Sequence, residues 1–170
     1  MSRTDPPVAA DERTTLLAFL DYHRDTLRLK AGGLDAAQLA VTLPPSEMTL
    51  GGMVKHLALV EHSWLRRVFL GEAYAEPWAS VDWEADVDWD WHSARDDSPE
   101  EIWALYERMV ADADAVVAGA GLEDLSVKPS RQTGEPFRLR WILLHLVEEY
   151  ARHNGHADLI RESIDGATGE

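Results

Sequence analysis

Apolar residues recur at helical spacing along four long stretches of the chain, and this pattern limits the fold more than any other feature. The stretches run over about residues 11–31, 49–70, 98–119 and 138–165 of the 170-residue sequence. Each has an apolar face that needs a partner to bury it, with polar residues on the opposite face. Substantial connecting segments separate the stretches. We therefore expect an all-α protein, a four-helix bundle with long inter-helix connections.

Local signals mark where several of these helices begin and end. Ser98 and Glu101 have the spacing of a capping box, and Pro99 suits the first helical position. Gly71 follows the second stretch and Gly166 follows the fourth. Glycine is the commonest residue just past a helix end. These signals predict where the third helix begins and where the second and fourth end, and Gly32 and Gly33 are expected to stop the first.

The connecting segments differ in character. Residues 78–93, WASVDWEADVDWDWHS, place tryptophans among aspartates, which suits neither an ordinary solvent loop nor an unbroken helix. We expect a covering segment that packs its rings on the outside of the helices, with a hydrophobic lid or a dimer contact as the functional alternative. Residues 120–136 are expected to form a loop containing a short extended pair. Residues 1–10 are expected to form a flexible arm of a single domain spanning residues 1–170.

Composition excludes several kinds of partner. The formal net charge of −15 opposes binding to the nucleic acid backbone or to anionic lipid, so neither nucleic acid nor a membrane is expected as a partner. The chain has no cysteine, so imidazole, carboxylate and water must supply the ligands of any metal. No stretch resembles a secretion signal or reaches the roughly 18 apolar residues of a membrane span. We therefore expect a cytoplasmic protein.

Three ionisable residues lie on the apolar faces of the second and fourth stretches. Glu149 and His153 are four residues apart and return to the same side of a helix. His56 shares a stripe with Met53 and Val60, which directs its ring toward the core. Burying an ionisable side chain without a polar partner costs on the order of several kcal/mol. A divalent metal bound by two imidazoles and one carboxylate would compensate and leave one position open.

Periodicity alone does not choose this set of ligands. His145 precedes Glu149 by the same four residues that separate Glu149 from His153. A hydrogen-bonded polar core network or a surface-facing helix would also explain these residues. The other histidines are weaker candidates: His62 is expected to face solvent, and neither His23 nor His92 is expected to bind a metal.

The residues around these histidines resemble a known family. The segments TLGGMVKHLALVEHSWLRRVFLGE (49–72) and RWILLHLVEEYARHNGHADLIRESIDG (140–166) resemble the DinB-like superfamily, in the branch that includes mycothiol-dependent S-transferases. The resemblance implies a DinB-like four-helix bundle and a divalent metal, zinc first, with nickel or manganese as alternatives. It also implies His56, Glu149 and His153 as the metal ligands. Many relatives carry histidine at the position of Glu149, whereas the similar mycothiol-dependent maleylpyruvate isomerase branch carries glutamate.

The resemblance implies a function as well. We expect a metal-dependent transferase that joins a low-molecular-weight thiol of the mycothiol type to an electrophilic small molecule. A metal would stabilise the thiolate, so a protein without cysteine could perform thiol chemistry. His156 and Arg152 would orient or pair with an anionic ligand, although Arg152 also suits an ordinary exposed position. The alternatives are a thiol-dependent isomerase of an unsaturated acid and a non-enzymatic bundle that binds a metal or another ligand, with a homodimer possible in each case.

Overall fold

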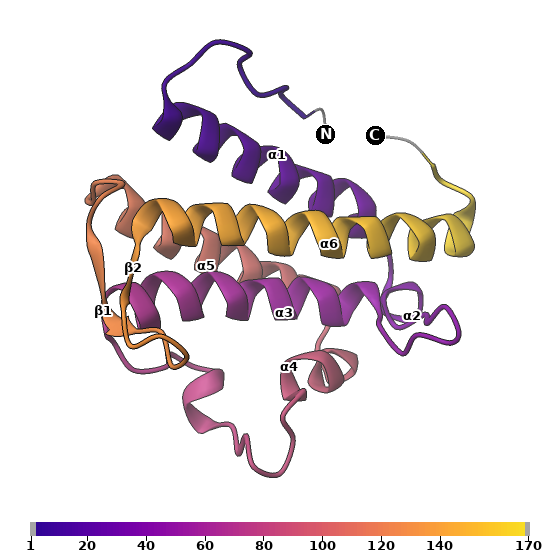
Figure 1. The fold of residues 1–170 in the computed structure, drawn as a ribbon. Coiled ribbons are helices and arrows are strands. Elements are labelled where there is room, and N and C mark those ends of the chain that lie inside the picture. The colour runs from indigo at the N-terminus through magenta and orange to yellow at the C-terminus, as the bar shows by residue number, and fades with distance from the viewer. Residues whose placement is uncertain (1–2, 169–170) are drawn as a thin grey trace.

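The computed structural model describes residues 3–168, and these are mostly helical (Figure 1). Four of the helices in this part of the chain are long: α1 (Glu12–Ala31), α3 (Leu50–His62), α5 (Pro99–Ala118) and α6 (Leu139–Asp165). The shorter helical elements are α2 (Ala36–Leu39), η1 (Ser63–Phe69), η2 (Trp78–Ser80), α4 (Trp89–His92) and η3 (Ser93–Asp96). Strands β1 (Leu125–Pro129) and β2 (Pro136–Arg138) form one small antiparallel sheet. The expected short extended pair is thus confirmed, and it makes the fold mostly rather than wholly helical.

The ends of the long helices follow the signals in the sequence. The Ser98 hydroxyl accepts a hydrogen bond from the Glu101 backbone N–H (3.2 Å), and the Glu101 carboxylate accepts one from the Ser98 N–H (2.8 Å). Pro99 occupies the first turn of α5, so the predicted capping box is confirmed. At the other end of the chain, Gly166 has a φ of 74° and ends α6 in the left-handed conformation that glycine adopts without strain.

The long helices bury their apolar faces against one another. Helix α6 lies between α1 and α3, and α5 packs on α3 behind them (Figure 1). Burial of these faces removes large apolar side chains from water, which is the main favourable contribution to folding. The largest fully buried side chains include Trp78, Tyr106, Tyr150, Leu27, Leu57, Met53, Ile102 and Leu139.

The apolar pattern predicted one regular helix to residue 70, but α3 ends at His62. After His62 the chain widens into the π-helix η1, where the Leu70 N–H bonds to the Leu65 carbonyl oxygen at 3.2 Å. Gly71 then turns the chain with a φ of 78°. A Cβ on Gly71 would lie 2.6 Å from Val127 Cγ1, so glycine allows β1 to approach closely. The small sheet thus packs against η1 through β1.

A buried polar network links the four long helices. The Arg24 guanidinium on α1 donates two hydrogen bonds to the Glu61 carboxylate on α3, at 2.7 and 2.9 Å. The Tyr150 hydroxyl on α6 donates to the same carboxylate at 2.9 Å and lies 3.0 Å from the Tyr106 hydroxyl on α5. Burial raises the pKa of both tyrosines, and the Glu61 charge raises it further. Removing Arg24 would leave the buried Glu61 carboxylate without a cation, which is strongly destabilising. Arg24 itself also pairs with Asp21 and Asp114, at 3.0 and 2.8 Å.

Residues 78–93 cross the outside of α3, as expected for a covering segment. The Trp78 ring is buried, and Trp83, Trp89 and Trp91 are partly buried against the core. Helix α4, within this segment, contacts α3 (Figure 1). The aspartates between the rings mostly face solvent, but Asp90 is buried. This single buried carboxylate brings the segment to the candidate site.

The beginning of the described chain runs alongside α1. Residues 3–11 form neither helix nor strand, and the Arg3 guanidinium donates to the Thr26 hydroxyl at 2.8 Å. The same guanidinium lies 4.5 Å from the centre of the Tyr22 ring, a favourable cation–π position. Across residues 3–168, each helix is either too short or too polar to cross a membrane.

Candidate metal centre

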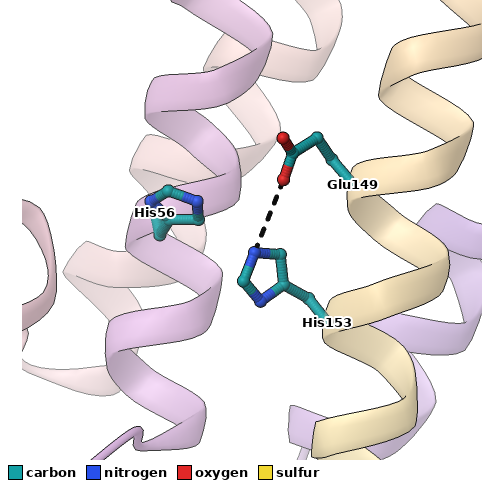
Figure 2. Close-up of side chains that lie close together, drawn as sticks. All are labelled: His56, Glu149 and His153. Carbon is teal, nitrogen blue, oxygen red and sulfur yellow. Dashed lines mark ion pairs between the residues drawn. The ribbon is translucent and has the colours of Figure 1, made fainter.

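Three of the residues singled out by their spacing meet between two helices (Figure 2). Each of His56, Glu149 and His153 offers one ligand atom, and these atoms all lie within 4.8 Å of one another. His56 comes from α3, whereas Glu149 and His153 come from consecutive turns of α6. All three residues are half-buried. The structure thus brings together residues that are almost a hundred positions apart in the sequence.

Core packing of the two helices explains this convergence. On α3, the buried Met53 and Val60 flank the stripe that carries His56. On α6, Leu146 and Tyr150 are buried at neighbouring positions of the helix. The apolar residues anchor both helices, so the polar side chains at the edge of the same faces are held opposite each other.

The separation of Glu149 and His153 is compatible with a shared cation. Glu149 Oε2 and His153 Nε2 are 3.6 Å apart, which is beyond the usual range of a hydrogen bond. Two ligands bound about 2.0–2.1 Å from a tetrahedral ion are roughly 3.3 Å apart, close to this separation. The imidazole of His153 lowers the pKa of the Glu149 carboxyl, against the opposing effect of burial. Glu149 is therefore ionised near neutral pH, as a ligand must be.

A buried carboxylate orients His56. Asp90 Oδ2 lies 2.7 Å from His56 Nδ1, and its side chain is 5% exposed. With Nδ1 protonated and donating to Asp90, the Nε2 lone pair is free to bind a cation. Metal-binding histidines in proteins are commonly held by a carboxylate in this way. The arrangement therefore fits a divalent metal.

An indole ring closes the group on one side. The Trp91 ring stacks on His56, with ring centres 4.7 Å apart and an angle of 26° between the planes. Its centre is also 5.5 Å from that of His153. Stacking fixes the orientation of the His56 ring and shields it from solvent. The composition of residues 78–93 identified this segment as unusual, but no local signal predicted that Asp90 and Trp91 would contact the histidines.

The alternative histidine also lies beside Glu149. His145 Nε2 is 3.3 Å from Glu149 Oε1, and His145 Nδ1 is 3.1 Å from Glu148 Oε2. The ligand atoms of this second group also lie within 4.8 Å of one another, but all three residues come from one helix and Glu148 is exposed. Such an arrangement encloses a cation on one side only. The set with His56, by contrast, has ligands on two facing helices.

The two proposed substrate contacts have different surroundings. The His156 ring centre lies 6.2 Å from that of His153, and within residues 3–168 the buried Nδ1 of His156 has no hydrogen-bond partner. Arg152 has a side chain that is 68% exposed, and it lies 3.8 Å from Glu148. The structure therefore places His156 beside the three-residue group and does not bring Arg152 to it.

The expectation that His62 faces solvent is wrong. His62 is buried, its Nε2 accepts a hydrogen bond from the Ala75 N–H (3.0 Å), and its ring stacks on Trp78. Burial lowers the pKa of His62, which keeps the ring neutral and able to accept this bond. The π-helix and the covering segment, neither visible in the helical pattern, enclose it. His23 is half-buried on α1, and His92 is exposed beside Asp86.

Fold and site together define the class: a mostly helical protein with a group of two histidines and one glutamate suited to a divalent metal. A family model described as MST, Mycothiol-S-transferase, matches residues 15–166, from α1 to just beyond α6. The chain therefore belongs to the mycothiol S-transferase family, and the resemblance stated from the sequence is confirmed. No curated protein matches the chain at a significant level.

Proposed function

We propose that this protein is a metal-dependent S-transferase that joins a mycothiol-type thiol to an electrophilic small molecule. Family membership supports a mycothiol S-transferase-like function. The observation that carries the metal dependence is the convergence of His56, Glu149 and His153 from two helices. We further propose that the long helices form the DinB-like four-helix bundle implied by the resemblance. Zinc is the proposed ion because two imidazoles, one carboxylate and an open position are typical of its catalytic sites, with nickel or manganese as alternatives.

Each residue near the site has a distinct proposed task. His56, Glu149 and His153 hold the ion, and Asp90 keeps the His56 ring in the tautomer that leaves Nε2 free. Trp91 excludes water from one side of the His56 ring. A bound divalent ion would lower the pKa of a thiol, so that its thiolate is populated near neutral pH.

The transfer itself needs no cysteine from the protein. The sulfur of the thiol forms a bond to the electrophilic carbon, the bond from that carbon to its leaving group breaks, and the thiol proton passes to water. Where the electrophile is a conjugated double bond, the displaced electron pair takes up that proton instead. His156, beside His153, is the proposed contact for an anionic part of the bound molecules, and Arg152 would reach them only by moving from its exposed position.

A product assay tests this function. Purified protein, loaded with zinc, is mixed with mycothiol and the electrophile 1-chloro-2,4-dinitrobenzene, and both conjugate formation and thiol loss are measured. The proposal predicts one conjugate formed for each thiol consumed, loss of the rate on chelation, and loss of the rate in His153→Ala. His145→Ala, which alters the neighbouring histidine, is the matched control and should retain most of the rate.

Other outcomes distinguish the alternatives. An isomerase would convert an unsaturated acid without net loss of thiol, whereas a non-enzymatic binding protein would leave the rate at its uncatalysed value. Full activity of His153→Ala with a lost rate in His145→Ala would contradict the proposed ligand set and assign the role to His145.

A further inference from the structure

A large cleft lies between η1, the small sheet and the beginning of α6. Its volume is about 1070 Å³, which is ample for a small aromatic ligand. In Figure 1 this region is the end of the molecule marked by β1 and β2. The residues proposed to hold the metal do not line it. The cleft therefore needs an explanation separate from the metal centre.

Aromatic rings form one side of the cleft. Phe137 and Trp141 have ring centres 4.7 Å apart, and the Trp64 ring meets Phe137 edge to face at 5.2 Å. Trp141 is 45% exposed although it is one of the largest apolar side chains. Exposed aromatic surface inside a concave region is typical of ligand-binding sites, because flat rings stack on flat ligands at little cost in conformational entropy.

The cleft is also rich in positive charge. Arg67, Lys128 and Arg131 line it, and in residues 3–168 none of these three forms an ion pair with a carboxylate. The Arg67 guanidinium lies 3.9 Å from the centre of the Tyr74 ring and donates to its hydroxyl at 3.1 Å. Lys128 donates to a backbone carbonyl oxygen at 3.2 Å. These contacts position the cations without neutralising them.

The remaining charges of the lining do not remove this excess. Arg138 and Arg140 also line the cleft, and both pair with Glu123, with Arg140 lying 3.3 Å from Glu12 as well. Glu12 and Glu135 are the carboxylates of the lining. Five of the sixteen lysines and arginines thus surround one cleft in a chain of net charge −15. An anionic ligand would be attracted locally although the protein as a whole repels it.

The aromatic side of the cleft continues toward the candidate metal centre. The Trp141 ring stacks on His145, with ring centres 5.1 Å apart and an angle of 17° between the planes. The Trp64 ring meets the same imidazole at 4.6 Å. His145 Nε2 in turn lies 3.3 Å from Glu149 Oε1. One side chain therefore connects the cleft to a proposed metal ligand.

We propose that this cleft binds a planar aromatic anion, whose ring packs against the exposed side of Trp141 and whose carboxylate or sulfonate pairs with the cations of Arg67, Lys128 and Arg131. Arginine suits this role because its planar fork donates two parallel hydrogen bonds to a carboxylate. Binding of such an anion does not depend on the metal. If this anion is the electrophile of the transfer, a step that rests on the proposed function, the electrophile belongs to the class of aromatic anions.

Calorimetric titration of the full-length protein tests the proposal with 2-naphthoate and its uncharged analogue 2-naphthamide. We expect one naphthoate per chain and at least about tenfold weaker binding of the amide, the size of one charge-assisted contact. The double variant Lys128→Gln/Arg131→Gln and the separate variant Trp141→Ala should each weaken naphthoate binding by about tenfold. Arg108→Gln removes an exposed cation of α5 outside the cleft and should leave binding unchanged.

Several results would overturn the assignment. The acid and the amide could bind with equal affinity, or naphthoate could show no saturable binding. Arg108→Gln could also lose as much naphthoate affinity as the double variant. Naphthoate affinity retained in both cleft variants would also overturn it. Circular dichroism of each variant serves as the control for folding. His153→Ala should bind naphthoate like the wild type, and loss of binding there would place the ligand elsewhere. Naphthoate binding without transferase activity would refute the proposed function and leave the cleft assignment standing.

Discussion

Replacement of Asp90 should weaken metal binding by an amount that depends on what replaces it. The Asp90 carboxylate lies 2.7 Å from His56 Nδ1 and is almost fully buried, so solvent does not screen the interaction. Asparagine keeps the size and an acceptor oxygen but removes the charge, and we expect about tenfold weaker binding. Alanine also removes the acceptor, and we expect about a hundredfold loss. These losses correspond to about 1.4 and 2.7 kcal/mol.

The assay is competition for zinc between the protein and a chromophoric chelator of known affinity. Asp88→Asn is the matched control, because Asp88 is an exposed aspartate two residues away whose side chain makes no capping bond. Thermal unfolding of the metal-free proteins separates a loss of metal affinity from a loss of fold. Unchanged zinc affinity in Asp90→Ala, or an equal loss in Asp88→Asn, would refute the role given to Asp90.

Three further predictions concern the stability of the fold. Glu61→Gln should lower the free energy of unfolding by roughly 2 kcal/mol in urea titrations, because the buried Arg24 guanidinium loses the carboxylate that accepts two of its hydrogen bonds and keeps only Asp21 and Asp114. Burial lowers the pKa of His62 in the folded protein, so the free energy of unfolding should fall as the pH drops below about 6.5, the pKa of histidine in the unfolded chain. His62→Gln should make this dependence on pH shallower. Gly52→Ala should be destabilising, because its Cβ would lie 2.9 Å from Trp91 Cε3. Its control is Gly155→Ala, whose Cβ would meet nothing within 4 Å and which should add about 0.5–1 kcal/mol to the free energy of unfolding.

Features set by neighbouring residues could be predicted from the sequence. The start of α5 follows from Ser98, Pro99 and Glu101, and its hydrogen bonds are those of the predicted capping box. The predicted ends of α1 and α6 agree with the structure within one or two residues. Helical periodicity and capping both act over a single turn, so they leave a readable local pattern.

Features that depend on contacts between distant segments could not be predicted in this way. Arg24 and Glu61 are 37 residues apart, and burial of the Glu61 carboxylate is tolerated because the Arg24 guanidinium lies against it. His62 looked exposed because its immediate neighbours are polar, but η1 and the covering segment enclose it. No residue pattern marked the π-helix itself.

The candidate site shows the same division. Spacing alone placed Glu149 and His153 on one face of a helix, but it placed His145 and Glu149 there equally well. The family resemblance, rather than the helical period, favoured His153. Asp90 lies 34 residues from His56 on a different element, so its contact with the ring depends on how the covering segment folds back over α3. The assignment of ligands remains a prediction.

The central claim is that His56, Glu149 and His153 bind one divalent ion per chain. Elemental mass spectrometry of tag-free protein, purified without added metal or chelator and then titrated with zinc, nickel and manganese, tests it most directly. The account predicts nearly one ion per chain in the wild type and in His145→Ala, and a loss of that ion in His153→Ala. Wild-type protein that stays metal-free throughout the titrations, or an undiminished metal content in His153→Ala, would contradict it.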